Sequence, residues 1–161
     1  MELSMKLKAL VISGVVVVAA LGAGYVLLTR SLAPAGYIDP ADQALVSLGK
    51  KVYAAQCVAC HGSALEGQPN WRQRLPNGRL PAPPHDVSGH TWHHPDGVLF
   101  DIVKRGLVPG ETAPAGYESD MPAYGAILSD EEIRASIAYI KHTWPQQALD
   151  IQRKLTEQAS R

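Results

Sequence analysis

The stretch Cys57-Val58-Ala59-Cys60-His61 places two thiols one helical turn apart, with an imidazole directly after the second thiol. These two cysteines are the only ones in the chain. A disulfide between them would close almost no loop, so it would add little to the stability of a fold. The pair therefore points to chemistry rather than to structure.

The C-x-x-C-H pattern is the signature of c-type haem attachment. At this spacing two thiols can bind the vinyl groups of one haem while the histidine binds its iron. We therefore predict Cys57 and Cys60 as the covalent haem thioethers and His61 as the proximal iron ligand.

Three other uses of the cysteines stay open. A thioredoxin-like pair needs a strand–helix setting, whereas residues 48–55 have a helical pattern. A zinc site needs two more ligands, which histidines farther along the chain could supply. A plain disulfide is the third.

Residues 9–29 carry no charge and include four consecutive valines. At about 1.5 Å per residue, a helix of this length spans the roughly 30 Å core of a bilayer. Lys6 and Lys8 precede the run, so the positive-inside rule places the N-terminus in the cytoplasm. We predict a single-pass protein of the inner (cytoplasmic) membrane, with the rest of the chain facing the periplasm or the cell exterior. A cleaved signal peptide is the alternative, and it would export the same domain.

Helix signals organise the rest of the chain. Ser129 and Glu132 have the spacing of a capping box, and Pro145 ends or kinks the helix that follows. A middle helix is predicted over residues 95–105, and an ordered loop over residues 67–84. We divide the chain into a cytoplasmic stub and transmembrane anchor (1–30), a short linker (31–40), a domain (41–145) and a tail (146–161). The tail could be a frayed helix or a docking element.

The charge of the chain gives no sign of a nucleic-acid partner. Glu2, Lys6, Lys8 and Arg30 are the charged residues within 1–36, and their removal leaves 12 basic and 14 acidic side chains. A nucleic-acid-binding domain usually has a basic surface instead.

Residues 41–145 resemble class I cytochrome c, a family of small, all-helical electron carriers. The resemblance rests on the order and spacing of Gly49-x-x-x-Tyr53-x-x-x-Cys57-x-x-Cys60-His61-Gly62, Met121-Pro122-Ala123-Tyr124, Leu128-Ser129-Asp130-Glu131-Glu132-Ile133 and Ile137-Ala138-Tyr139-Ile140. It implies an all-α cytochrome c fold around one covalently attached haem c. It also implies that the helix carrying Gly49 and Tyr53 crosses the C-terminal helix near Tyr139. A proline after the motif, Pro83 or Pro84, would accept a hydrogen bond from Nδ1 of the proximal histidine.

Met121 is the only methionine beyond residue 5, and it matches the distal iron ligand of the family. Methionine–histidine ligation raises the reduction potential of a haem. Alternatively, Met121 fills a gap in the core. Further candidates for the distal position are His85, His90, His93, His94 and His142. Within this set, the cluster of His90, His93 and His94 is either a set of cap and surface residues or a second metal site. Residues whose chemistry suits the haem propionates are Trp71, Arg79 and Trp92.

The resemblance implies an electron carrier, or an electron-transfer subunit of a larger redox complex, rather than an enzyme. Its partners would be membrane redox proteins: a quinol-oxidising complex, a terminal oxidase or a periplasmic dehydrogenase. The sequence does not choose among them, and it fixes neither the reduction potential nor the oligomeric state. A haem enzyme or gas sensor with a labile sixth ligand is the alternative.

Overall fold

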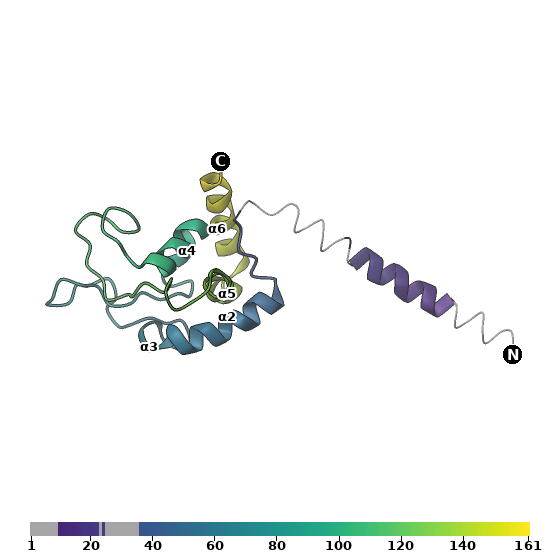
Figure 1. The fold of residues 1–161 in the computed structure, drawn as a ribbon, viewed down its shortest axis with the longest axis horizontal. Coiled ribbons are helices and arrows are strands. Elements are labelled where there is room, and N and C mark those ends of the chain that lie inside the picture. The colour runs from purple at the N-terminus through teal and green to yellow at the C-terminus, as the bar shows by residue number, and fades with distance from the viewer. Residues whose placement is uncertain (1–9, 23, 25–35) are drawn as a thin grey trace. The chain divides into compact units, whose positions relative to one another are not determined.

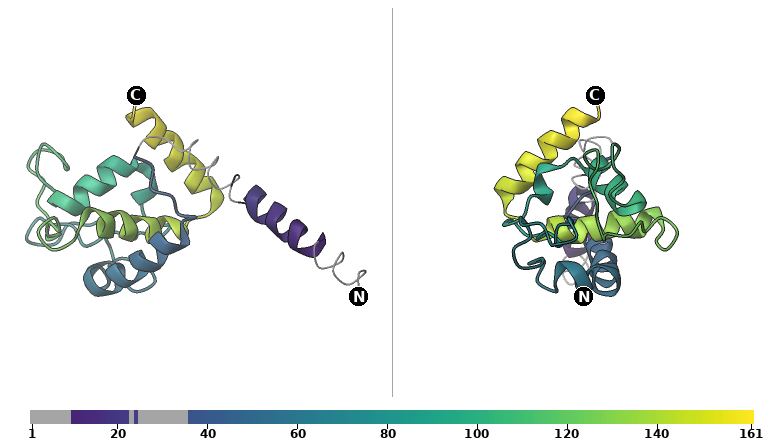
Figure 2. Two further views of the ribbon diagram at one scale, coloured as in Figure 1. Left: turned by 45° about the vertical axis from the view of Figure 1, so that its right-hand side comes forward. Right: turned by 90° about the vertical axis from the view of Figure 1, so that its left-hand side faces the viewer.

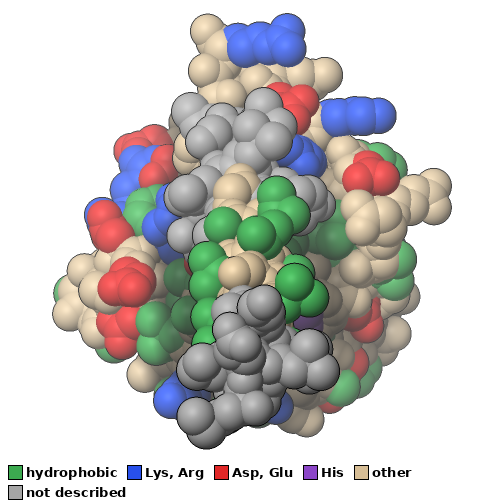
Figure 3. Space-filling model, turned by 90° about the vertical axis from the view of Figure 1, so that its right-hand side faces the viewer, with side chains coloured by type: hydrophobic (Ala, Val, Ile, Leu, Met, Phe, Trp, Pro, Cys, Tyr) green, Lys and Arg blue, Asp and Glu red, His purple; other side chains and the backbone are tan. Residues whose placement is uncertain are grey.

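The computed structural model describes residues 10–22, 24 and 36–161, and it divides the chain into two compact units, Met1–Ala33 and Pro34–Arg161. In the first unit, residues 10–22 form a helix of hydrophobic and small side chains without charge (Figure 3). No helix in the described ranges is both long enough and apolar enough to cross a bilayer. The other residues of the predicted anchor, 1–9, 23 and 25–30, lie outside the described residues.

The second unit is built from helices, as predicted. They are α2 (Gln43–Gln56), α3 (Val58–His61), the short 3-10 helix η1 (Thr91–His93), α4 (Asp96–Arg105), α5 (Asp130–His142) and α6 (Gln146–Ala159). Residues 36–161 contain no β-strand and only one isolated bridge, between Pro109 and Ala113. Long loops connect α3 to η1 and α4 to α5 (Figure 1).

Local sequence signals set the helix ends. The Ser129 hydroxyl accepts a hydrogen bond from the Glu132 N–H, and the Glu132 carboxylate accepts one from the Ser129 N–H, so the predicted capping box is confirmed. The middle helix ends at Gly106, whose φ of 77° is unfavourable for other residues. The first helix of the domain begins at Gln43, because Asp42 caps it by accepting from two backbone N–H groups.

Helix α5 is the centre of the domain. It lies between α2 and α4, and α6 lies on the side away from α2 (Figures 1 and 2). Ile133, Ile137 and Ile140 recur at helical spacing along α5 and are buried as one apolar stripe. These side chains form the core together with residues of α2 and α4.

The crossing of α2 and α5 depends on Gly49. A Cβ atom at this position would lie 1.9 Å from the carbonyl oxygen of Ala135 and 2.9 Å from the Cβ of Tyr139. The two backbones are therefore in contact, which only glycine permits here. One turn along, the rings of Tyr53 and Tyr139 meet with centroids 5.4 Å apart. The crossing expected from the family resemblance is confirmed.

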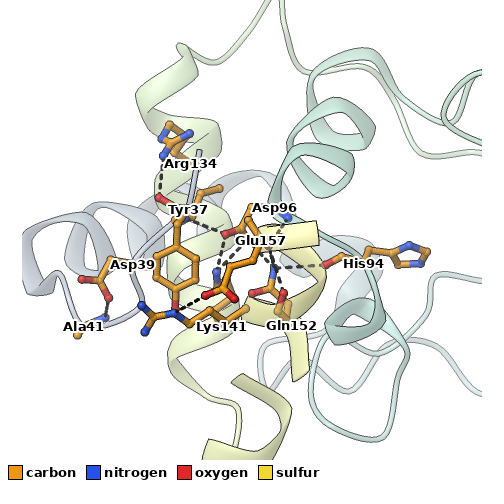
Figure 4. A network of polar contacts seen from close by, with 12 residues as sticks. Tyr37, Asp39, Ala41, His94, Asp96, Arg134, Lys141, Gln152 and Glu157 are labelled. Atoms are coloured by element: carbon orange, nitrogen blue, oxygen red, sulfur yellow. Dashed lines mark hydrogen bonds and ion pairs between the residues drawn. The ribbon is translucent and has the colours of Figure 1, made fainter. Parts of the chain in front are cut away.

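A buried ion pair connects α5 to the start of α4 (Figure 4). Lys141 of α5 and Asp96 at the start of α4 have no side-chain exposure, and Nζ lies 2.8 Å from both carboxylate oxygens. Asp96 also accepts from the Ile38 backbone N–H at 2.8 Å and from Gln152 Nε2 of α6 at 2.7 Å. Burial lowers the pKa of Lys141 to about 8, although the Asp96 carboxylate acts in the opposite direction.

These contacts settle the state of residues 146–161, which the sequence left open. Gln152 and Thr156 of α6 are buried, and α6 packs against α4 and η1. Removing one member of a buried ion pair costs about 3–5 kcal/mol, because it leaves the other charge without a partner. The segment is therefore an integral helix of the domain.

We expect Gly49→Ala to destabilise the domain, because the added methyl group would push α2 away from the Ala135 carbonyl. Overpacking of this kind costs about 1–3 kcal/mol. Gly97→Ala in α4 is the matched control, since nothing lies within 4 Å of its added Cβ. There the change should be neutral or stabilising by up to about 1 kcal/mol. Denaturant unfolding measures both, and a Gly49→Ala protein as stable as the parent would show that the contact is not required.

Candidate functional site

His61 is the last residue of α3 and is buried. Its Nδ1 atom lies 2.9 Å from the carbonyl oxygen of Pro83. A carbonyl can only accept, so Nδ1 carries the hydrogen and Nε2 keeps its lone pair. Burial lowers the pKa of His61, against the opposing effect of this hydrogen bond. The side chain is therefore a neutral imidazole near pH 7, the form that binds metal ions.

The structure selects Pro83 rather than Pro84 as the hydrogen-bond partner, and two glycines allow this. Gly67 has a φ of 67°, and an added Cβ would lie 2.6 Å from the carbonyl carbon of Pro83. At Gly89 an added Cβ would lie 2.0 Å from the carbonyl oxygen of Pro84. The chain therefore passes close to both prolines and holds the Pro83 carbonyl within hydrogen-bonding distance of His61 Nδ1.

Two cavities meet at His61. The larger, of about 350 Å³, is lined by Cys57 and Cys60, and the smaller, of about 160 Å³, is lined by His90 and His94. Side chains that line both include His61, His85 and Met121, so the two cavities adjoin. Most of the remaining wall is apolar, with contributions from Leu80, Leu99, Ile102, Val103, Ile137 and Ile140.

Met121 belongs to the loop between α4 and α5, which is attached at several points. Its backbone N–H donates to the Ser119 hydroxyl at 3.0 Å. Tyr124 is tied to α4 and to α2: its backbone N–H donates to the Val103 carbonyl at 3.0 Å, and its hydroxyl donates to the Gln56 carbonyl at 2.8 Å. The thioether is thus brought to the cavity by a loop fixed to the ends of α2 and α4.

The two cysteines lack the features of a redox or zinc site. Cys57 is half-buried and Cys60 is exposed. Burial, and to a smaller extent Cys60, raises the pKa of the Cys57 thiol to about 11. Reactive dithiols have lowered thiol pKa values instead. Within the described residues, no group of three or more His, Cys, Asp or Glu side chains is arranged to hold a metal ion.

The other histidines fall into two groups: three line a cavity, and two do not. His85 stacks on His61 with ring centroids 3.8 Å apart, and its Nδ1 is buried without a hydrogen-bond partner. His90 and His94 meet edge to face at the smaller cavity. His93 and His142 are exposed and do not line either cavity. The histidine cluster therefore does not assemble into the second metal site considered from the sequence.

The three residues suggested for propionates lie outside the cavity linings. Trp92 donates its indole N–H to the Val87 carbonyl at 3.2 Å. The Arg79 guanidinium pairs with the carboxylates of Asp120 and Glu118. Trp71 stacks on His90, with ring centroids 5.5 Å apart. Their polar groups are committed to other contacts or lie away from the cavity.

Sequence analysis missed how His85 and Tyr124 contribute. His85 was considered only as a rival distal ligand, whereas it packs against His61. Its position two residues after Pro83 was the available signal, since a backbone that bonds His61 must place nearby side chains beside it. No local pattern predicted the hydrogen bond from the Tyr124 hydroxyl to the Gln56 carbonyl, because its two partners are 68 residues apart in the sequence.

Two thiols, a neutral imidazole and a thioether thus surround an apolar space inside a helical domain. These donors fit a large, mostly apolar cofactor that contains iron, and they define the class of small helical haem-binding domains. The family model described as Cytochrome c matches residues 46–144, more than half of the chain, and the chain belongs to this family. Membership implies a covalently bound haem c and a role in electron transfer. Comparisons with curated proteins and with solved structures found no match.

Proposed function

We propose that this protein is a membrane-anchored cytochrome c with one haem that transfers single electrons on the periplasmic face. Cys57 and Cys60 form the thioether bonds, His61 is the proximal iron ligand and Met121 is the distal one. The observation that carries the proposal is that His61 and Met121 line one space whose larger end also contains both cysteines. The haem supplies the one-electron chemistry of its iron.

The side chains around the site suit an electron carrier. Burial keeps His61 neutral, and the Pro83 carbonyl fixes the orientation and the tautomer of its ring, as such hydrogen bonds commonly do for metal-binding histidines. The Met121 thioether favours reduced iron and so raises the potential. His61 and Met121 would both hold the iron, which would leave no open position for a substrate. This favours a carrier over the enzyme or gas-sensor alternative.

Membrane attachment is proposed on the uncharged run of residues 9–29, of which 10–22 are helical. The short linker of residues 31–40 would keep the domain near the lipid surface, within reach of membrane redox complexes. A quinol-oxidising complex, a terminal oxidase and a periplasmic dehydrogenase are the partner classes that this geometry suits.

Covalent attachment is tested with the protein expressed in cells that mature c-type cytochromes. The parent protein should keep its haem after denaturation and acid–solvent extraction, and intact-mass measurement should give one haem per chain. The double substitution Cys57→Ser and Cys60→Ser should lose the haem on extraction, because no thioether can form. Ala59→Ser, between the two cysteines, is the matched control and should keep it. Parent protein that is colourless after extraction, with both thiols free, would contradict the proposal.

Met121→Ala should leave the haem attached but remove the distal sulfur. We expect a changed visible spectrum, a lower reduction potential and rapid binding of CO by the reduced protein, since an axial position opens. Met5→Ala makes the same substitution outside the domain and should change none of these. An unchanged spectrum and potential in Met121→Ala would rule out this ligand, and rapid CO binding by the parent protein would favour the sensor or enzyme.

The anchor is tested by fractionation. The full chain should remain with membranes after high-salt and alkaline washes and be released by detergent. Val16→Arg places a charge near the middle of the run, at a cost of roughly 2.5–3.5 kcal/mol, and should reduce the membrane-bound fraction. Val16→Leu is the matched control. A mature N-terminus beyond about Ala33, found by N-terminal sequencing, would replace the anchor with a cleaved signal peptide.

A further inference from the structure

The smaller cavity is unusually rich in imidazoles. Of the six histidines in the chain, His61, His85, His90 and His94 all line it. The proposed function uses only His61. The other three have no part in it: His85 and His94 are half-buried, and His90 is exposed while its side chain also lines the cavity.

The two cavities give the space two distinct ends. Cys57 and Cys60 line the larger cavity but not the smaller one, whereas His90 and His94 line the smaller but not the larger. Haem c is bound to cysteines through its two former vinyl groups, and its two carboxylates lie on the other half of the porphyrin ring. A haem attached at the cysteine end would therefore turn its carboxylates toward the end that holds His90 and His94.

A carboxylate that leaves water needs a hydrogen-bond donor or a cation as partner. At this end of the cavity, Thr91 already donates its hydroxyl to the Pro84 carbonyl, at 3.5 Å. Arg79, a candidate from the sequence, is paired with two carboxylates. The imidazoles of His90 and His94 are the groups on this wall that can acquire a positive charge without breaking an existing ion pair.

Packing holds both histidines in place. The ring of His90 stacks on Trp71 with an interplanar angle of 9°, and the Arg72 guanidinium stands 4.1 Å from the centre of the Trp71 ring. The backbone carbonyl of His94 accepts from Gln152 Nε2 of α6 at 3.2 Å. These contacts position the exposed ring of His90 and the backbone of His94.

The surroundings make both imidazoles sensitive to an added negative charge. Burial lowers the pKa of His90 and of His94, and the neighbouring cations act in the same direction: His93 on both, Arg72 on His90, and His90 on His94. His85 also faces His90. Asp96 at the start of α4 is already occupied by Lys141 and Gln152. A nearby carboxylate would raise the pKa of each histidine again, toward the physiological range.

We propose that His90 and His94 bind the haem carboxylates and couple reduction of the iron to proton uptake. This rests on the proposed function. One electron from the donor protein converts Fe(III) to Fe(II), and one proton from solvent binds an imidazole nitrogen of the pair. Oxidation returns the electron to the acceptor and the proton to solvent. The added electron makes the cofactor more negative, so the reduced protein holds the proton more tightly. The reduction potential therefore falls as the pH rises through the interval between the oxidised-state and reduced-state pKa values.

The experiment is a spectroelectrochemical titration of the full-length, haem-loaded protein in detergent, from pH 5 to 9. Within the coupled interval, a tenfold fall in proton concentration should lower the equilibrium constant for reduction by up to tenfold. The reduction potential then falls by up to about 59 mV, the value for a one-electron couple. The double substitution His90→Gln and His94→Gln should flatten this dependence. Its potential should lie below that of the parent at low pH and converge with it at high pH, where the parent histidines are neutral. A merely structural defect would shift the potential at every pH.

His93→Gln is the matched control, because His93 lies between the pair in sequence but does not line the cavity and packs edge-on against Trp92. It should keep the pH dependence. If the double variant fails to mature, the single variants and a pH-indicator measurement of proton uptake by the parent on reduction replace it. A pH-independent potential, no proton uptake, or a pH slope that survives in the double variant would overturn this inference. In each case covalently retained haem would leave the proposed function standing.

Discussion

The site depends on one hydrogen bond, from His61 Nδ1 to the carbonyl of Pro83. It joins residues 22 positions apart and decides which imidazole nitrogen is free. Because the acceptor belongs to the backbone, the bond survives only if the loop after α3 keeps its path. The close passages at Gly67 and Gly89 fix that path, so the chemistry of His61 is determined by backbone geometry well beyond its own helix.

The opposite wall is built by a similar principle. Met121 lies in a loop with few regular hydrogen bonds, yet Tyr124 ties that loop to the ends of α2 and α4. Those helices are in turn held by α5, against which α2 packs in backbone contact at Gly49. A position set by helix ends varies little, which an electron carrier needs because its metal site must not reorganise greatly between two charge states.

Much of this was predictable from local patterns. The capping box at Ser129 and the end of α4 at Gly106 follow from residue types at fixed spacings, and the close approach at Gly49 was implied by the family resemblance. What the sequence could not show were pairings between distant polar residues. Lys141 and Asp96 are 45 positions apart and look like surface residues, yet both are fully buried. Their pairing, and with it the packing of α6, emerges only when the helices assemble.

The two sets of buried polar groups differ in a way that bears on function. The Asp96–Lys141 pair is satisfied within the chain, through Ile38 and Gln152 as well as through each other. Among the described residues, three buried side-chain atoms have no hydrogen-bond partner, namely Tyr53 Oη, His85 Nδ1 and Gln152 Oε1, and of these residues only His85 lines the two cavities. The imidazoles of His85, His90 and His94 line a mostly apolar space, which suits a ligand that brings polar atoms of its own. A porphyrin is such a ligand, since it has an apolar body with carboxylates on one side. The ion-pair network therefore serves stability, and the histidines that line the cavity mark the place where polar atoms of the cofactor would lie.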